Sequence, residues 1–560
     1  MTPRIEITPL YAAAALCIMA AQVSAQEPSL IAHWNLAGDA RDSSGNERHL
    51  QPYGVDWSAA GPRGVFGTAA TFDGRGSFLE LPAAIAPALG ARDFTLSLWV
   101  HTDAELDDVI GDLAGQFDEA TRTGWQISIQ NAAGVTSSQP NYRQVHFGID
   151  QGHLEPSWTD HGRVGQAMFV FALCVHDGAL YAATCESGVG QRGRVYRSDG
   201  ESRWIDMGAP DACNSISSLA SFGGSLYAGS SKYRLAGSAL PESENPNSGG
   251  KIFRLGGAGD WEYIGTLPEV EAIGSLVVYR GKLYASSMYK PGGLFRHDGG
   301  TTWTACGTPG GKRINSLAVY NGSLWATGYD EAGIYRYDGT NWHHTGKAGE
   351  GRQTYALAVH RGGLVVSQWP EAKVFRYVAD GNWQSIGRLG NELESMPLVV
   401  YNGKLFGGTL PLAEVYRFDG DESWTSVGRL DHTPDVKYRR AWSMAVFQGR
   451  LFCGTLPSGH VHSIEAGKNV TYDRELVPGW RHVAAARRGN RLELFIDGEL
   501  AAKSAEFRAT DYDLTVARPL KIGFGAHDYF RGRLADIRLY QGALSSQAVR
   551  AQYTVGRPPQ

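Results

Sequence analysis

The chain has 560 residues, of which 42% are apolar, 19% are charged and 71 are glycine, and its formal net charge is −5. Such a composition is typical of a large globular protein, and low charge with many glycines suits an all-β fold rich in turns. A mildly acidic chain without a basic stripe does not have the electrostatic footprint of a nucleic-acid-binding protein, so we expect no nucleic acid as a partner.

Residues 1–25 have the pattern of a secretory signal peptide. Arg4 precedes an apolar run over residues 10–21, and Val23 and Ala25 occupy the two positions that a signal peptidase recognises. The run is too short to span a bilayer, so we expect no membrane span. The sequence therefore predicts a secreted protein, either extracellular or periplasmic.

Residues 28–152 do not repeat and predict β-strands at 30–34, 70–72, 78–81, 94–100, 124–129 and 145–149. Residues 467–556 resume the same pattern, with strands expected at 480–484, 491–500, 520–523 and 532–540. Between these two flanks the chain is organised differently.

The middle of the chain consists of a repeat in which an aromatic-Arg pair precedes a Trp, and a Gly follows the Trp four positions later. The unit Tyr335/Arg336, Trp342, Gly346 is one of six copies. The other five are Tyr196/Arg197 with Trp204 and Gly208, Phe253/Arg254 with Trp261 and Gly265, Phe295/Arg296 with Trp303 and Gly307, Phe375/Arg376 with Trp383 and Gly387, and Tyr416/Arg417 with Trp424 and Gly428.

A second hairpin precedes each unit, and the Leu that begins its second strand occurs seven times, 40 to 57 residues apart. Four strands per unit of that length predict a seven-bladed β-propeller over residues 153–466. The seventh copy has no Trp strand after it, but Trp158 and Gly162 precede the first copy with the same spacing. We expect that early strand to complete the last blade and close the ring. An open solenoid of hairpins is the alternative, and it gives Trp158 no role.

The flanks carry motifs that resemble, in order, the laminin-G-like, concanavalin A-like jelly roll. These motifs are Asp42-Ser43-Ser44-Gly45-Asn46 and residues 72–74, 94–100, 480–484, 496–498 and 532–540. The resemblance implies an all-β protein in which one jelly-roll sandwich, residues 28–152 and 467–556, is interrupted by the seven-bladed β-propeller. The propeller repeats resemble kelch-like and Asp-box propellers, in which the Asp, Gly and Trp are structural.

In a propeller, the first strand of each blade lines the channel and begins at the face that usually binds ligands. Aligning the repeats on Leu317 predicts that blades four to seven present polar and aromatic side chains at this mouth. They are Arg313, Gln353, Tyr355, Glu394, Arg440 and Trp442. Such groups suit an acidic carbohydrate. The alternative is that they line the channel and are satisfied by water and by one another.

No nucleophile elbow, metalloprotease motif, phosphate loop or EF-hand occurs, so we assign no catalytic residue. The sequence favours a secreted protein that binds an extracellular glycan or glycoprotein through the jelly roll and the propeller mouth. A polysaccharide-degrading enzyme, either a glycoside hydrolase or a uronate lyase, is one alternative. A protein-interaction scaffold is another.

The resemblance also implies a structural Ca²⁺, with Asp42 and Asp536 as the carboxylates that the first and last strands would bring together. The alternative is that Asp42 caps its own turn. Five cysteines follow the signal peptide. Among them, Cys185 and Cys213 lie in connections on the same face of the propeller, which predicts one disulfide between them.

Overall fold

The computed structural model describes residues 27–62, 67–152, 157–200 and 203–556. The expected signal peptide, residues 1–25, lies outside the described residues. Within them the protein is all-β, apart from short 3₁₀ turns and one α-helix, α1 (Ser546–Gly556). None of the helices described is long and apolar enough to cross a membrane.

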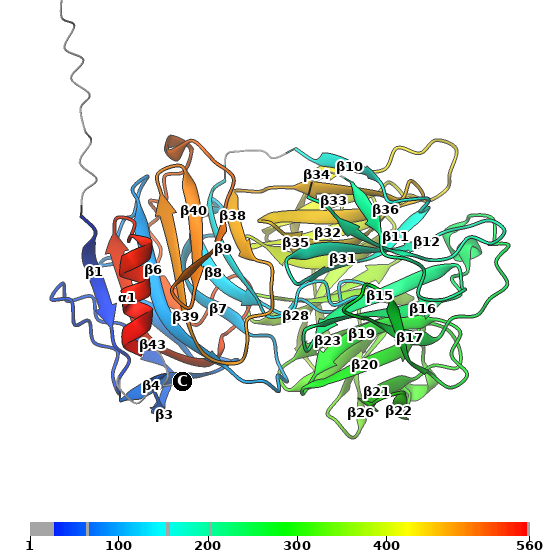
Figure 1. Ribbon diagram of the computed structural model, residues 1–560, viewed down its shortest axis with the longest axis horizontal. Helices are drawn as coiled ribbons and strands as arrows, with labels where there is room; N and C mark the ends of the chain where they lie inside the picture. Colours follow the sequence, from blue (N-terminus) through cyan, green and yellow to red (C-terminus); the bar gives the residue numbers. More distant parts are fainter. Residues whose placement is uncertain (1–26, 63–66, 153–156, 201–202, 557–560) are drawn as a thin grey trace, which may run out of the picture.

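Strands from the two flanks of the chain pair with one another in two sheets, the blue and orange-to-red strands of Figure 1. The first sheet has the order β3 (Asp56–Ala60), β4 (Thr68–Asp73), β43 (Arg531–Gln541), β6 (Phe94–Thr102), β39 (Gly479–Arg488), β40 (Arg491–Ile496) and β41 (Glu499–Lys503), with β1 (Ser29–Trp34) also paired to β43. The second has the order β2 (Gln51–Tyr53), β5 (Phe78–Leu81), β42 (Leu520–Ile522), β7 (Gly111–Asp118), β8 (Thr123–Gln130), β9 (Gln144–Gln151) and β38 (Lys468–Tyr472).

One apolar core joins these two sheets. It includes Leu96 of β6 and Ile127 of β8, both at most 2% exposed. Because β38 pairs with β9, with Lys468 opposite Ile149, the chain leaves the sandwich and returns to it at neighbouring strands. The whole segment between them can therefore attach at one place without splitting the sheet.

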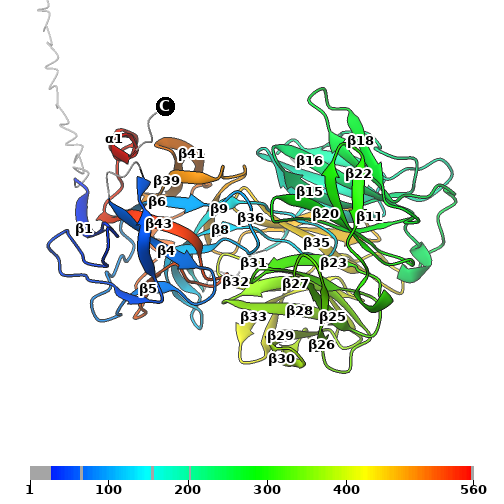
Figure 2. The ribbon, with the colours of Figure 1, turned by 90° about the horizontal axis from the view of Figure 1, so that it is seen from below.

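That segment forms the propeller-like arrangement of sheets shown on the other side of the molecule in Figures 1 and 2. Five of its sheets have four strands. Two of them are β19 (Ile273–Tyr279), β20 (Lys282–Ser287), β21 (Leu294–Gly299) and β22 (Thr302–Ala305), and then β23 (Ser316–Tyr320), β24 (Ser323–Thr327), β25 (Gly333–Tyr337) and β26 (Trp342–Lys347). The next two are β27 (Gln353–His360), β28 (Gly363–Trp369), β29 (Lys373–Ala379) and β30 (Asn382–Arg388), and then β31 (Glu394–Tyr401), β32 (Lys404–Leu410), β33 (Glu414–Gly420) and β34 (Ser423–Arg429). The fifth combines β35 (Arg440–Phe447), β36 (Arg450–Leu456) and β37 (His460–Ile464) with the early strand β10 (Thr159–Arg163).

The remaining eight strands form a single sheet, so the structure has five separate four-stranded sheets and not the seven that the repeat predicts. These strands are β11 (Phe169–His176), β12 (Ala179–Cys185), β13 (Val195–Ser198), β14 (Trp204–Asp206), β15 (Ser215–Phe222), β16 (Ser225–Ser231), β17 (Lys251–Leu255) and β18 (Trp261–Thr266). The physical reason is local: Cys185 at the end of β12 pairs with Ser215 at the start of β15, which joins two groups of four strands.

The predicted ring closure is confirmed, because β10 pairs with β37. The repeat's Trp explains how successive units are held together, since its indole N–H donates to a carbonyl of the preceding unit. Six tryptophans make this hydrogen bond, at 2.8 to 3.1 Å: Trp158 to Val427, Trp261 to Met207, Trp303 to Ile264, Trp342 to Cys306, Trp383 to Thr345, and Trp424 to Ile386. Trp204 is the exception, with a buried indole nitrogen that has no partner among the described residues.

The repeat's Gly is required where the next Trp packs against it. Gly265 has φ +135°, and a Cβ there would lie 2.5 Å from Cδ1 of Trp303. Gly428 has φ +139°, and a Cβ there would lie 2.8 Å from Cδ1 of Trp158. Both the backbone conformation and the close contact exclude a larger residue at these two positions.

A segment of the sandwich, residues 131–143 between β8 and β9, fills the centre of the propeller; we call it the plug. It is almost wholly buried and bonds to the first strands of several sheets. Gly134 accepts a bond from the Leu357 amide at 3.0 Å. Ser137 donates to the Ser217 carbonyl at 2.7 Å, and Asn141 accepts from the Val446 amide at 3.0 Å. The channel expected from the sequence is therefore occupied by this chain's own backbone.

Candidate functional site

Four of the six predicted mouth residues lie in or beside a buried aromatic cluster, which closes the propeller centre beyond the plug. Tyr355 and Trp442 belong to it, together with Phe169, Phe171 and Tyr233. The rings are close, with centroids of Phe171 and Tyr233 4.9 Å apart. The plug reaches this cluster from below, since Thr136 donates a hydrogen bond to the Trp442 carbonyl at 3.3 Å. This cluster forms the floor of the mouth.

Glu394 and Arg440 are buried beside the aromatic cluster, at 7% and 6% exposure. Burial raises the pKa of Glu394, while the positive charge of Arg440 and the hydroxyl of Tyr355 oppose the rise. Burial lowers the pKa of Arg440, but the surrounding tyrosines and Glu394 outweigh this and raise it. One oxygen of Glu394 and Nε of Arg440 have no hydrogen-bond partner among the described residues. Glu394 and Arg440 therefore each have an atom free to bond a ligand, but burial keeps solvent from reaching these side chains freely.

The loop between β16 and β17 covers these groups. It contains the 3₁₀ helix η2 (Leu235–Ser238), whose Gly237 carbonyl accepts a bond from Arg440 at 3.4 Å. The amide of Tyr233 donates to Asn214 at 2.8 Å, which fixes the start of the loop. The repeat spacing carries a signal for this covering loop. The longest interval between the repeat's leucines is the one between Leu226 and Leu283, and the loop lies within it.

The other two predicted residues, Arg313 and Gln353, lie at an open depression on the rim of the mouth, which we call the rim depression. Its volume is about 750 Å³. Gln353 lines it, with Lys290, Gly310, Gly311, Lys312, Tyr329, Asp330, Glu331, Lys347, Gly351, Arg352 and Trp369. Arg313 stands behind Asp330, to which it is paired at 2.9 Å. The structure thus brings two predicted residues to an accessible site and buries four.

Cations outnumber anions in the rim depression. Its two acidic side chains are engaged, Asp330 by Arg313 and Glu331 by Lys312 at 3.3 Å. Burial raises the pKa of Asp330, but the hydrogen bonds and charge of Arg313 outweigh it and lower the pKa. The other three cations of the lining, Lys290, Lys347 and Arg352, are exposed and form no ion pair with any described residue. Trp369 is half-buried among them, with the Arg352 guanidinium 5.6 Å from its ring centre.

A second cleft, of about 420 Å³, lies where the second sheet of the sandwich meets the propeller. Phe117 and Phe524 line it, and the ammonium group of Lys521 is 5.0 Å from the Phe524 ring centre. Arg361, from the turn between β27 and β28, closes it through an ion pair with Glu119 at 2.5 Å. No sequence pattern marks this cleft, because its residues come from four separate regions of the chain.

Groups of the protein already engage the carboxylates of Asp42 and Asp536, the two residues of the predicted calcium site. Asp42 accepts hydrogen bonds from the amides of His33, Ser44 and Arg48 at 2.9 to 3.0 Å, as a turn cap does. Asp536 contacts His33 at 2.7 Å and is paired with Arg538 at 3.0 Å, and the positive charge of Arg538 repels a cation. Calcium binding there stays a prediction, and melting that is independent of calcium would rule it out.

The predicted disulfide between Cys185 and Cys213 is not formed in the structure, where both are free, as are the other cysteines described. Cys213 directs its thiol to the Ser215 carbonyl at 3.2 Å. Burial and the Asp211 carboxylate raise the pKa of Cys213 to about 11, which disfavours the thiolate form.

The family described as the concanavalin A-like lectin/glucanases superfamily matches residues 441–550. No curated protein has a significant match to the chain. The solved structures that match part of this chain include the extracellular domain of BT4673 from B. thetaiotaomicron, at 12% identity and TM-score 0.40, covering 56% of this chain and 40% of that one. YCF48 bound to D1 peptide has 13% identity and TM-score 0.39, with coverage of 57% and 97%. The WD40 β-propeller domain of Doa1 has 12% identity and TM-score 0.39, with coverage of 55% and 97%.

Proposed function

We propose that this protein is an exported carbohydrate-binding protein whose rim depression binds an anionic glycan. The observation that carries the proposal is the set of exposed cations without ion-pair partners, Lys290, Lys347 and Arg352, around the half-buried Trp369. Cations that have no internal partner are available for carboxylate or sulfate groups. The apolar ring beside them offers a surface for the face of a sugar, and the open shape suits a chain that extends beyond the site.

Residues 153–466 are proposed to be a seven-bladed propeller inserted into a single jelly roll, residues 28–152 and 467–556. Two observations support seven blades. The strands β11–β14 and β15–β18 each follow the four-strand order of the other units, and Trp261 bonds to Met207 in the way that links the other successive units. The pairing of β38 with β9 supports a single insertion, because the chain leaves and re-enters at adjacent strands.

The jelly roll is proposed to supply a second glycan surface at the cleft of Phe117, Lys521 and Phe524. Its aromatic rings and flanking charges are the groups that carbohydrate sites use, and the superfamily match to residues 441–550 includes Lys521 and Phe524. Export is proposed because residues 1–25 have the pattern of a signal peptide.

An enzyme acting on polysaccharide is the second candidate, and one observation favours it. Glu394 carries a buried oxygen without a partner, beside Arg440 and Tyr355, and burial raises its pKa as in many catalytic acids. The loop containing η2 would have to move before a sugar could reach this carboxyl group. We favour binding because the accessible site contains no acid that is not already paired. A protein-interaction scaffold is the third candidate, and binding to protein without any glycan would favour it.

A glycan array tests the proposal. The mature protein should bind uronate-containing or sulfated glycans in preference to their neutral counterparts. Arg352→Ala and Trp369→Ala should weaken that binding, whereas Lys521→Ala and Phe524→Ala report on the second cleft. The bound glycans should then be incubated with the protein and assayed for reducing ends and for unsaturated uronate. Release of either product would favour the enzyme, and the absence of any glycan binding would contradict the proposal.

A further inference from the structure

We propose that Asp160, His460 and His462 form a binding site for a divalent transition metal such as Zn²⁺, and that the metal fastens the strand that closes the propeller ring. One ligand atom from each residue lies within 4.8 Å of the others. Asp160 is on β10 and the two histidines are on β37, so the site bridges the pair of strands that joins the beginning and the end of the repeat region.

The register of the two strands places the three side chains on one face. Asp160 stands opposite His462, and His460 is two residues before His462, so both imidazoles project to the same side of β37. The arrangement therefore follows from backbone pairing and does not depend on the positions of flexible loops.

The separations suit a zinc ion. Ligand atoms about 2.0–2.1 Å from a tetrahedral zinc stand roughly 3.3 Å from one another. Nδ1 of His460 is 3.0 Å from the Asp160 carboxylate, and Nδ1 of His462 is 3.9 Å from it. One distance is shorter and the other longer than the ligand-to-ligand separation around zinc, so small side-chain rotations bring the three ligand atoms to the tetrahedral geometry. Two imidazoles and a carboxylate are a donor set that zinc prefers, with the fourth position left to solvent.

The surroundings leave these groups available. Asp160 forms ion pairs only with the two histidines among the described residues, and with neither Lys nor Arg. His462 is 8% exposed, and its Nε2 is buried with no hydrogen-bond partner among the residues described. The ring is therefore not held by an internal acceptor. Asp160 and His460 remain partly exposed, which gives an ion a path from solvent.

The location gives the metal a structural role. The strand β10 has five residues and pairs with β37 at three positions, with a register shift between Asp160 and Arg163. A metal held by both β10 and β37 would reinforce this pairing, because ligands from two strands fix their separation.

The test uses the untagged mature protein, stripped with a chelator and dialysed. Adding ZnCl₂ should give one bound ion per chain in a calorimetric titration and raise the melting temperature. It should also slow hydrogen exchange of the backbone amides of Thr159 to Arg163. His460→Ala, His462→Ala and Asp160→Asn should each weaken zinc binding by more than about tenfold, since each removes a ligand.

His343→Ala is the matched control, because His343 is paired with Asp338 at 2.8 Å on the outer strand β26, and the adjacent His344 projects to the opposite face of that strand. It should bind zinc as the wild type does. Trp158→Phe distinguishes loss of a metal ligand from loosening of β10. This variant removes the indole hydrogen bond beside β10 but keeps all three ligands, so it should still bind zinc. Zinc binding that persists in His460→Ala and His462→Ala, or a wild-type protein that takes up no zinc, would overturn the proposal.

Discussion

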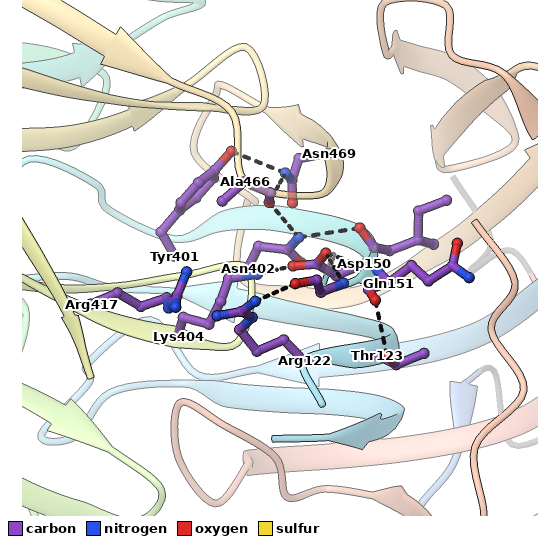
Figure 3. A network of polar contacts seen from close by, with 12 residues as sticks. Arg122, Thr123, Asp150, Gln151, Tyr401, Asn402, Lys404, Arg417, Ala466 and Asn469 are labelled. Atoms are coloured by element: carbon purple, nitrogen blue, oxygen red, sulfur yellow. Dashed lines mark hydrogen bonds and ion pairs between the residues drawn. The ribbon is translucent and has the colours of Figure 1, made fainter. Parts of the chain in front are cut away.

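The ammonium group of Lys404 and the carboxylate of Asp150 form a buried ion pair that joins the propeller to the sandwich (Figure 3). Their side chains are 4% and 6% exposed, and Lys404 begins β32 while Asp150 lies near the end of β9. Burial lowers the pKa of Lys404, and the Asp150 charge opposes this. Asn402 extends the network by donating to the Ala466 carbonyl at 2.8 Å, so both ends of the propeller segment are fixed at one place.

Removing one partner of this pair leaves the other charge buried alone. Lys404→Met should therefore cost about 3–5 kcal/mol in the free energy of unfolding. The double variant Asp150→Asn with Lys404→Met should recover part of that loss. Lys373→Met is the control, because Lys373 pairs with Glu371 on the surface and should cost less than about 1 kcal/mol. Denaturant unfolding measures all three, and equal losses for Lys404→Met and Lys373→Met would contradict this account.

The two tryptophans at the ring closure should respond differently to the same substitution. Trp158→Phe removes the 3.0 Å bond to Val427 and should cost about 0.5–1.5 kcal/mol more than Trp204→Phe, whose indole nitrogen has no partner. Each change removes the same atoms, so the difference in unfolding free energy isolates the hydrogen bond. A larger loss in Trp204→Phe would mean that its indole is bonded in solution.

Asn141 in the plug should be essential for holding the sandwich in the propeller. Its side chain donates to the Val446 carbonyl at 2.7 Å and accepts from the Val446 amide at 3.0 Å. Asn141→Ala leaves both groups buried without partners and should cost about 1–3 kcal/mol for each unsatisfied group. Asn341→Ala, in an exposed turn, should change stability little. Thermal unfolding compares the two, and equal melting temperatures would show that the plug is not tightly bound.

Asp112 should make stability depend on pH. Burial raises its pKa to about 7, although the amides of His527 and Asp528 donate to it at 2.9 Å and oppose the rise. The folded state therefore keeps this proton up to about pH 7, while the unfolded chain loses it near pH 4. The contribution of this group to stability is complete below pH 4 and falls as pH rises to 7, by on the order of 1.4 kcal/mol per unit.

Asp112→Asn removes this proton equilibrium. The variant should melt close to the wild type at pH 4 and above it at pH 8, where the wild type must ionise a buried carboxyl group. The difference between the two melting temperatures is the quantity to measure, because groups remote from Asp112 titrate equally in both proteins. The prediction would be contradicted if the melting temperature of Asp112→Asn, relative to the wild type, fell as pH rises from 4 to 8.

Much of the fold is encoded locally and could be predicted. The spacing of Trp158 and Gly162 predicted that β10 pairs outside its own region, because the repeat defines what each fourth strand looks like. The plug could not be predicted in this way. Residues 131–143 carry no repeat or periodic pattern, and they bond to strands up to about 300 residues away, such as β35. The covering of the mouth could not be predicted either, because the loop between β16 and β17 also lies outside the repeat pattern. Alignment of the repeats placed Glu394 and Arg440 correctly at the starts of β31 and β35, but it could not show that this loop covers them.

The most direct test of the proposed binding site is a calorimetric titration of an anionic oligosaccharide into the wild type and into Lys347→Ala with Arg352→Ala. Each lost charge-assisted contact is worth about 1.5–3 kcal/mol, so the double variant should bind more than about tenfold more weakly, with a smaller dependence on salt. Lys503→Ala, which removes a surface cation of the sandwich, is the control and should bind as the wild type does. Unchanged affinity and salt dependence in the double variant would contradict the assignment of the glycan site to the rim depression.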